Sequence, residues 1–204
     1  MPLQNRVDPF GQLHAVPDRG AFMGNRGGCF HRPDQTLKPR HWASRQWIIC
    51  QLEFKGRTRK LMQPGLYTEL FFLDEATALA AGHRPCFECR RDAAKAFRDA
   101  TGLPAPVRVG DLDAVIAGEV QSVMKGETPR EEVDPATLPD GAFYAVGDTA
   151  FLRQGKTARP WSFAGYGAPQ PHPDRALRLT PAATCAALAN GYKPALHASA
   201  TRGS

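Results

Sequence analysis

The sequence predicts an α+β fold in which a small antiparallel sheet and short helices come first, and a C-terminal hairpin and helix follow. Residues 46–55 (QWIICQLEFK) alternate between apolar and polar side chains, as a strand with one buried face does. Asp74 precedes an alanine-rich run that ends at Gly82, which is the pattern of a short capped helix. Eighteen prolines and nineteen glycines favour short elements joined by many loops.

Local patterns place the other elements of the first half. Residues 1–40 are rich in glycine, proline and arginine, and we expect them to be irregular. A second strand is expected over residues 65–72, and a helix is expected from about residue 90 to Thr101, before Gly102. The side chains of the strand at 46–55 that we expect to face the core are Ile48, Cys50, Leu52 and Phe54.

The second half is expected to begin after a longer helix over residues 112–125. The apolar stripe predicted for that helix consists of Leu112, Val115, Ile116, Val120 and Val123. The later expected elements are a connector at 128–140, hairpin strands at 142–147 and 150–154, a short strand at 178–179, and a last helix that ends near Gly191. Thr180 is the expected N-cap of the last helix, with Pro181 at its first position.

Composition places the chain among ordinary globular proteins. Hydrophobic residues make up 42% and charged residues 23%, so the 204 residues can form one domain, or one domain with a smaller appendage. The first twenty residues contain no apolar run, and the longest apolar stretches are only a few residues long. We therefore expect a soluble, cytoplasmic protein without a secretory signal and without a membrane partner.

The positive charge is concentrated in the first third of the chain. The whole chain has a net charge of +6, whereas residues 1–60 alone hold eleven Lys and Arg against four Asp and Glu. A concentrated basic surface suits a phosphate backbone, because each neutralised phosphate releases a counterion. The alternative is a basic face that only contacts solvent. The residues predicted to contact DNA phosphates are Arg26, Arg32, Arg40, Arg45, Lys55, Arg57, Arg59 and Lys60.

The sharpest chemical motif is Cys86-x-x-Cys89. Two thiolates at this spacing can bind one ion when the backbone between them makes a tight turn, and the start of the following helix offers N–H groups to the sulfurs. Nearby arginines (Arg84, Arg90 and Arg91) are expected to lower the thiolate pKa values. An odd total of five cysteines argues against a disulfide framework, so zinc is the favoured interpretation, with a redox dithiol or free thiols as alternatives.

Residues 70–91 (LFFLDEATALAAGHRPCFECRR) resemble the second half of the Ada-type zinc domain. That domain is the N-terminal metal-binding part of bacterial DNA methylphosphotriester repair proteins and adaptive-response regulators. The matching features are the Phe-Phe strand, the alanine-rich helix ending in Ala-Ala-Gly, and Arg-Pro-Cys-x-x-Cys. The resemblance implies a zinc ion held by four cysteines, one of which accepts a methyl group from the DNA backbone.

The resemblance assigns Cys86 and Cys89 to the downstream cysteine pair and Cys50 to the first cysteine of the upstream pair. Phe54 stands where the second upstream cysteine would be, so a fourth ligand must come from elsewhere. The segment 27–31 (GGCFH) offers Cys29 and His31, of which His31 is preferred. His41 and His197 are weaker candidates, and His83 is expected to pack in the core.

Together these patterns divide the chain into a zinc-binding core with a basic segment at residues 1–127, and a hairpin and helix at 128–204 on the same unit. The leading hypothesis is a zinc-dependent, DNA-associated protein that serves DNA repair or a damage response. A second is enzymatic, with Cys50 as a zinc-activated methyl acceptor, or with His31 or His41 in a metal-assisted nuclease. A third is a structural zinc module for protein–protein contacts. The chain has no phosphate-binding loop and no dinucleotide fingerprint.

Overall fold

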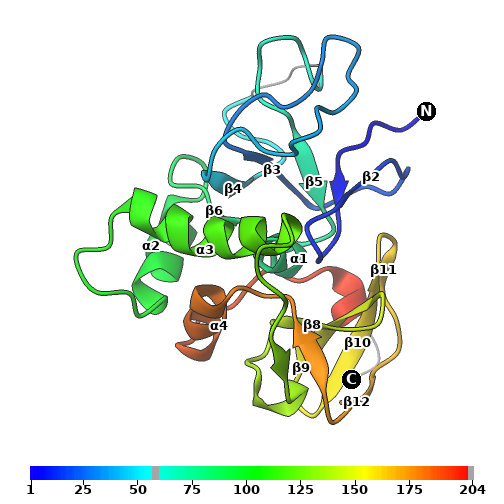
Figure 1. Ribbon diagram of the computed structural model, residues 1–204, viewed down its shortest axis with the longest axis vertical. Coiled ribbons are helices and arrows are strands. Elements are labelled where there is room, and N and C mark those ends of the chain that lie inside the picture. The colour runs from blue at the N-terminus through cyan, green and yellow to red at the C-terminus, as the bar shows by residue number, and fades with distance from the viewer. Residues whose placement is uncertain (57–59, 202–204) are drawn as a thin grey trace.

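The computed structural model describes residues 1–56 and 60–201 and has the expected α+β class, with four α-helices and two sheets in that part of the chain. Figure 1 shows the first sheet in the upper part of the view and the second sheet in the lower part, with the helices gathered between them. None of the described helices is both long enough and apolar enough to cross a membrane.

The first sheet is mixed, whereas an antiparallel sheet was expected. Its strand order is β2-β1-β5-β3-β4-β6, and two of its pairs, β1 with β5 and β4 with β6, are parallel. The strands are β1 (Arg6–Val7), β2 (Leu13–His14), β3 (Phe22–Arg26), β4 (Trp47–Cys50), β5 (Leu70–Phe72) and β6 (Arg84–Pro85). In each parallel pair the two strands are far apart in the sequence. The long connection between them lets the chain return before the second strand begins, so both strands run in the same direction.

Residues 1–40 are not irregular throughout, because they supply three strands, including β3 at the centre of the sheet. The sequence of β3 (FMGNR) lacks the apolar alternation that marks a strand. Gly24 in its middle allows β4 to approach closely, since a Cβ atom at this position would lie 2.2 Å from the carbonyl oxygen of Ile48. A glycine that weakens the sequence signal is therefore a requirement of the sheet.

The strand predicted at 46–55 exists but is shorter and presents the opposite face to the core. In β4 the fully buried side chains are Trp47 and Ile49, and the partly exposed ones are Ile48 and Cys50. Both faces of this strand are apolar, so alternation alone does not show which face packs inward. The prediction that Ile48 and Cys50 face the core is wrong, and this reversal places Cys50 on the open face of the sheet.

The second half contains more than the expected hairpin. Strands β8 (Phe143–Val146) and β9 (Thr149–Gln154) form the predicted antiparallel pair within a seven-stranded sheet of the described residues. Its other members are β7 (Glu132–Val133), β10 (Thr157–Ser162), β11 (Gly165–Tyr166), β12 (Gln170–Pro171) and β13 (Ala176–Arg178). Strand β10 was missed because Arg159 and Pro160 interrupt its apolar pattern.

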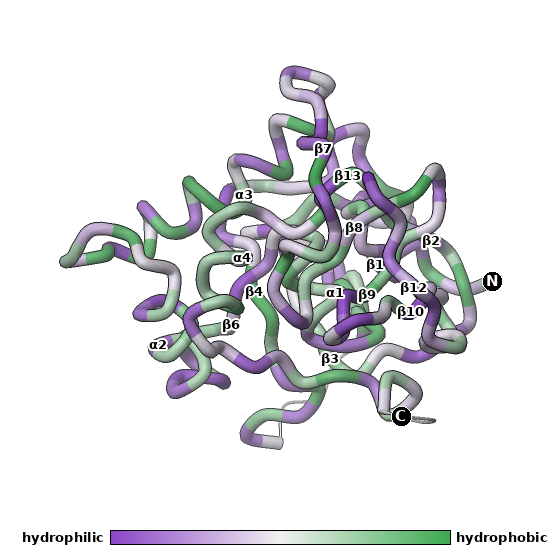
Figure 2. The backbone as a smooth tube through the Cα atoms, turned by 90° about the horizontal axis from the view of Figure 1, so that it is seen from below, coloured by the Kyte–Doolittle hydropathy of each residue, from purple (hydrophilic) through white to green (hydrophobic). Residues whose placement is uncertain are grey.

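Four helices lie at the positions that the sequence predicted. They are α1 (Glu75–Ala80), α2 (Arg91–Ala100), α3 (Val109–Met124) and α4 (Ala182–Ala189). Hydrophilic and hydrophobic residues alternate along α2 (Figure 2), and its buried side chains are Ala94 and Phe97. In α3, Leu112, Ile116 and Val120 are buried as expected, but Val115 is 41% exposed. The main core cluster joins the two halves, since it includes residues from Val7 to Tyr192.

Asp74 caps α1 as predicted and also connects this helix to the C-terminal half. Its Oδ1 accepts a hydrogen bond from the backbone N–H of Thr77 at 2.8 Å. Its Oδ2 accepts hydrogen bonds from the hydroxyl of Tyr166 at 2.7 Å and from the backbone N–H of His197 at 3.0 Å. The neighbouring Glu75 accepts a hydrogen bond from the Tyr192 hydroxyl at 2.6 Å. One helix start therefore links two distant parts of the chain.

We expect Tyr166→Phe to lower the free energy of unfolding by about 1–3 kcal/mol, because a buried carboxylate oxygen loses one of its donors. Urea unfolding followed by circular dichroism measures this loss. Tyr144→Phe is the matched control, since Tyr144 is also buried but its hydroxyl lies 3.1 Å from Nδ1 of the partly exposed His172, in place of a buried carboxylate. Equal losses in the two variants would contradict a special role for the Asp74–Tyr166 contact.

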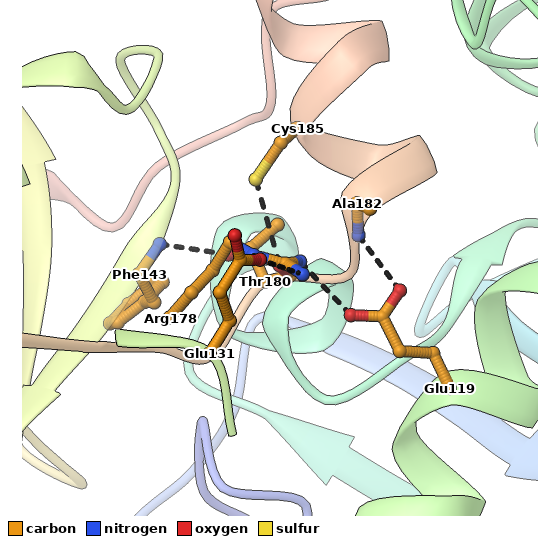
Figure 3. Close-up of polar contacts among 7 residues, drawn as sticks. All are labelled: Glu119, Glu131, Phe143, Arg178, Thr180, Ala182 and Cys185. Carbon is orange, nitrogen blue, oxygen red and sulfur yellow. Dashed lines mark hydrogen bonds and ion pairs between the residues drawn. The ribbon is translucent and has the colours of Figure 1, made fainter. Parts of the chain in front are cut away.

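The start of α4 differs from the prediction, because its N-cap is Pro181 and Thr180 has another role. The Thr180 hydroxyl accepts a hydrogen bond from the backbone N–H of Phe143 at 2.8 Å. As Figure 3 shows, the carboxylate of Glu119 accepts from the backbone N–H of Ala182 at 2.9 Å and from Arg178 at 3.0 Å. A side chain from α3 thus satisfies the helix start that Thr180 was expected to cap.

Candidate metal centre

Three cysteine sulfurs converge beside the end of β4. The Sγ atoms of Cys50, Cys86 and Cys89 all lie within 4.8 Å of one another. In a tetrahedral site with Zn–S bonds of about 2.3 Å, the sulfurs are about 3.8 Å apart, so this spacing suits one shared ion. The predicted downstream pair is therefore joined by the cysteine that the resemblance assigned to the upstream position.

The parallel pairing of β4 with β6 explains why Cys50 reaches the motif. Ile48 pairs with Arg84 and Ile49 pairs with Pro85, so the next residues along each strand, Cys50 and Cys86, lie side by side. The backbone N–H of Cys86 donates to the carbonyl oxygen of Ile49 at 3.0 Å, which extends this register. The sheet itself aligns two cysteines that are 36 residues apart in the sequence.

A tight turn brings Cys89 to the same place. The backbone N–H of Arg90 donates to the carbonyl oxygen of Cys86 at 3.0 Å, which closes the turn at the start of α2. The backbone N–H of Glu88 donates to the Cys86 sulfur at 3.3 Å. This is the predicted arrangement, in which backbone donors near a helix start stabilise negative charge on sulfur.

Two buried ion pairs hold the corner that carries the cysteines. Arg84 forms a bidentate pair with Asp113 of α3, with Nε–Oδ1 at 2.7 Å and Nη2–Oδ2 at 3.0 Å. Arg90 pairs with Glu75 of α1 at 2.8 Å. These two arginines were expected to act on the thiols, but their main partners are carboxylates. They position the corner by binding it to two helices.

The three thiols change one another's pKa values because they lie so close together. The hydrogen bond from Cys50 is the largest cause that lowers the pKa of Cys86, to about 5. The same hydrogen bond, followed by burial, raises the pKa of Cys50. Burial is the largest cause that raises the pKa of Cys89. One thiolate is thus stabilised by its neighbours, and a cation bound between the sulfurs would favour ionisation of the other two thiols.

The cysteines open onto a cleft of about 750 Å³. The apolar and aromatic side chains among its described lining are Met23, Ile48, Leu52, Phe54, Leu61, Tyr67 and Phe71, and the carboxylates are Glu53, Glu69 and Glu88. Ile48, Leu52 and Phe54 were expected on a buried face, and the sequence pattern did not predict this cleft. The signal that could have revealed it is the second apolar face of β4, formed by Trp47 and Ile49.

His31 is not in the sulfur cluster, and no other His, Cys, Asp or Glu of the described residues joins it. The His31 ring is buried, with Nδ1 at 2.7 Å from the Thr68 hydroxyl and Nε2 at 3.1 Å from the carbonyl oxygen of Gln63. The Cys29 sulfur lies 3.6 Å from the carbonyl oxygen of His31. The His31 side chain therefore connects two loops. Three of the four predicted ligands, without His31, lie together in the structure.

The other candidate histidines also lie outside the sulfur cluster. His83 is fully buried between the rings of Trp47, at 5.1 Å, and Phe72, at 4.7 Å, so its predicted packing role is confirmed. His41 is partly buried, and burial followed by the charge of Arg26 lowers its pKa. His197 accepts a hydrogen bond from the backbone N–H of Ser199.

The predicted phosphate contacts separate into three groups. Five of them are exposed: Arg32, Arg40, Arg45, Lys55 and Lys60. Arg57 and Arg59 lie outside the described residues. Arg26 is fully buried, and its Nη2 donates to the carbonyl oxygen of Gly11 at 2.8 Å while its guanidinium lies 4.1 Å from the centre of the Trp47 ring. The prediction for Arg26 is wrong, because its side chain is buried in the core. This burial lowers the pKa of Arg26 to about 9.

The donor set fits a thiophilic metal ion better than a redox dithiol. A dithiol needs only Cys86 and Cys89, whereas here a third sulfur, from the end of β4, joins the group. All five cysteines are free thiols in the structure. Comparisons with protein-family models, with curated proteins and with solved structures found no match to this chain.

Proposed function

We propose that this protein binds one zinc ion through Cys50, Cys86 and Cys89 and that it associates with DNA. The observation that carries the metal site is the convergence of three cysteine sulfurs from two distant segments within 4.8 Å. Thiolates select zinc over hard cations such as magnesium and calcium, and zinc accepts tetrahedral geometry without strain. The chemistry of the three donors therefore supports zinc as the proposed ion.

In this proposal the ion connects the end of β4 to the corner between β6 and α2. Both segments lie at the edge of the first sheet, where β6 contributes only two residues. Such a short strand makes few hydrogen bonds, so the metal adds stabilisation where the sheet has least of its own. The binding free energy of a structural zinc ion then contributes directly to folding.

Association with DNA is supported by the basic front segment and by the resemblance to the Ada-type zinc domain. Six exposed Lys and Arg among the described residues lie between positions 32 and 60, the same part of the chain that provides Cys50. Phosphate contacts from these residues would bring the nucleic acid near the metal centre. A role in DNA repair or a damage response follows from the resemblance and is part of the proposal.

Elemental analysis of the purified 204-residue chain tests the metal site. We expect one zinc per chain, and Cys50→Ser, Cys86→Ser and Cys89→Ser should each reduce zinc binding strongly. Cys185→Ser is the matched control, because the Cys185 sulfur lies 3.6 Å from the carbonyl oxygen of Thr180 and outside the cluster. Unchanged zinc content in all three cluster variants would contradict the site.

Duplex binding at increasing salt tests the DNA proposal. Arg40→Ala/Arg45→Ala should weaken affinity uniformly across sequences and reduce the slope of log K against log salt by about two, because each phosphate contact contributes about 0.9. Arg175→Ala is the control, since the Arg175 side chain is 78% exposed and lies just before β13, beside the second sheet and outside the basic front segment. An affinity that does not depend on salt would contradict phosphate contacts and favour an acidic protein partner for the basic segment.

A further inference from the structure

The metal centre has three protein donors and an adjacent cleft. A tetrahedral zinc ion takes four ligands, and sites with three protein ligands leave one position for a molecule from outside. Within residues 1–56 and 60–201, no fourth side chain of the ligating types joins the cluster. The two ring nitrogens of His31 contact Thr68 and Gln63, so this side chain joins two loops and is not placed at the sulfurs.

The cleft beside the sulfurs has the dimensions of a small-molecule site. Its volume of about 750 Å³ lies in the range that ligand pockets occupy, and all three cysteines are among its lining residues. Aromatic and aliphatic side chains supply much of the remaining wall, among them Leu52, Phe54 and Phe71. A ligand that reaches the metal must therefore place a donor atom at the sulfurs and an organic body against apolar side chains.

We infer that the fourth ligand is the sulfur of a small organic thiol that binds in this cleft. The inference rests on the proposed zinc site. Sulfur is the donor that matches the other three, and four sulfurs form one of the common complete ligand sets of zinc. The thiol would bind as its thiolate and release its proton to water, while its carbon skeleton packs against Leu52 and Phe54. A metal-bound thiolate remains nucleophilic at neutral pH, which suits the chain to hold such a molecule in an activated form.

Cobalt substitution makes the fourth ligand visible. The 204-residue chain is loaded with one equivalent of Co²⁺, whose absorption depends on the number of sulfur ligands, and is titrated with 2-phenylethanethiol. We expect a saturable increase in the sulfur-to-cobalt charge-transfer band at one thiol per chain. 2-Phenylethanol has the same apolar body and lacks the sulfur, so it should leave the spectrum unchanged.

A pair of matched variants tests the cleft wall. Leu52 is 47% exposed and lines the cleft, whereas Leu177 is 40% exposed and belongs to β13 of the second sheet. Leu52→Glu should weaken thiol binding by about five- to tenfold, because an apolar contact is replaced by a charge, and leave cobalt binding unchanged. Leu177→Glu should change neither measurement.

The outcomes separate this inference from the proposed function. A four-sulfur spectrum before any thiol is added would show that the chain supplies its own fourth sulfur, and would overturn the inference while leaving the metal site intact. A spectrum that does not respond to the thiol, or a thiol that removes the metal, would overturn it in the same way. Absence of stoichiometric cobalt and zinc before the titration would contradict the proposed metal site itself.

Discussion

Removal of zinc with a chelator is expected to lower the melting temperature of this protein by roughly 10 °C. An ion that binds only the folded state contributes about 4 kcal/mol when its free concentration is a thousandfold above the dissociation constant. For a chain of about 200 residues, each kcal/mol changes the melting temperature by about 2–4 °C. Differential scanning calorimetry of the zinc-loaded and the chelated protein measures the difference.

The prediction concerns the difference in melting temperature between the zinc-loaded and the chelated protein. It should disappear in Cys86→Ser and persist in Cys185→Ser, even if each substitution also changes the stability of the metal-free protein. Protons compete with zinc for thiolate sulfur, so the difference should shrink as the pH falls. A melting temperature that is independent of zinc would show that the cysteine cluster does not connect β4 to the corner through a metal.

Asp113→Ala is expected to lower the free energy of unfolding by about 3–5 kcal/mol. The side chains of Arg84 and Asp113 are only 6% and 3% exposed, so the substitution leaves a buried guanidinium without its carboxylate partner. Arg84 lies two residues before Cys86, and the pair joins β6 to α3. We therefore expect weaker zinc binding in the same variant. Chemical denaturation and a zinc-chelator competition measure the two effects.

Two comparisons distinguish a buried ion pair from a general effect of removing charge. Glu132→Ala breaks the pair with Arg175, whose side chains are 56% and 78% exposed, and should cost less than about 1 kcal/mol. Arg84→Met/Asp113→Leu replaces both charges with apolar groups and should recover most of the loss in Asp113→Ala. A loss in Asp113→Ala that does not exceed that of Glu132→Ala would contradict the structural role of the Arg84 pair.

The helix and turn signals were predictable because their physics lies within a few residues. Asp74 caps α1 by accepting from Thr77, three positions later, and Gly82 adopts a positive φ of 83° just after the helix. The Cys86-x-x-Cys89 turn likewise depends on hydrogen bonds between near neighbours. These elements were found because the residues that make each one are adjacent in the sequence.

Strand faces and strand partners were harder to predict, because they depend on what packs against them. The sequence of β4 is apolar on both faces, and only the core formed around Trp47 and Ile49 shows which face is buried. Arg26 counts as a surface charge in any sequence pattern. The structure buries it because Gly11 and Trp47, from other parts of the chain, provide a carbonyl oxygen and an aromatic face.

The α+β class, the capped α1 helix and the cysteine pair at positions 86 and 89 could all be predicted from the order of the residues alone. The resemblance also pointed to Cys50, and the tertiary structure shows how Cys50 reaches the pair. Only the tertiary structure shows that His31 is held at Thr68 and that a cleft opens beside the sulfurs. The physical reason is the parallel register of β4 and β6, which aligns residues 36 positions apart. Such a register results from the packing of the whole sheet, so it cannot be predicted from a local pattern of residues.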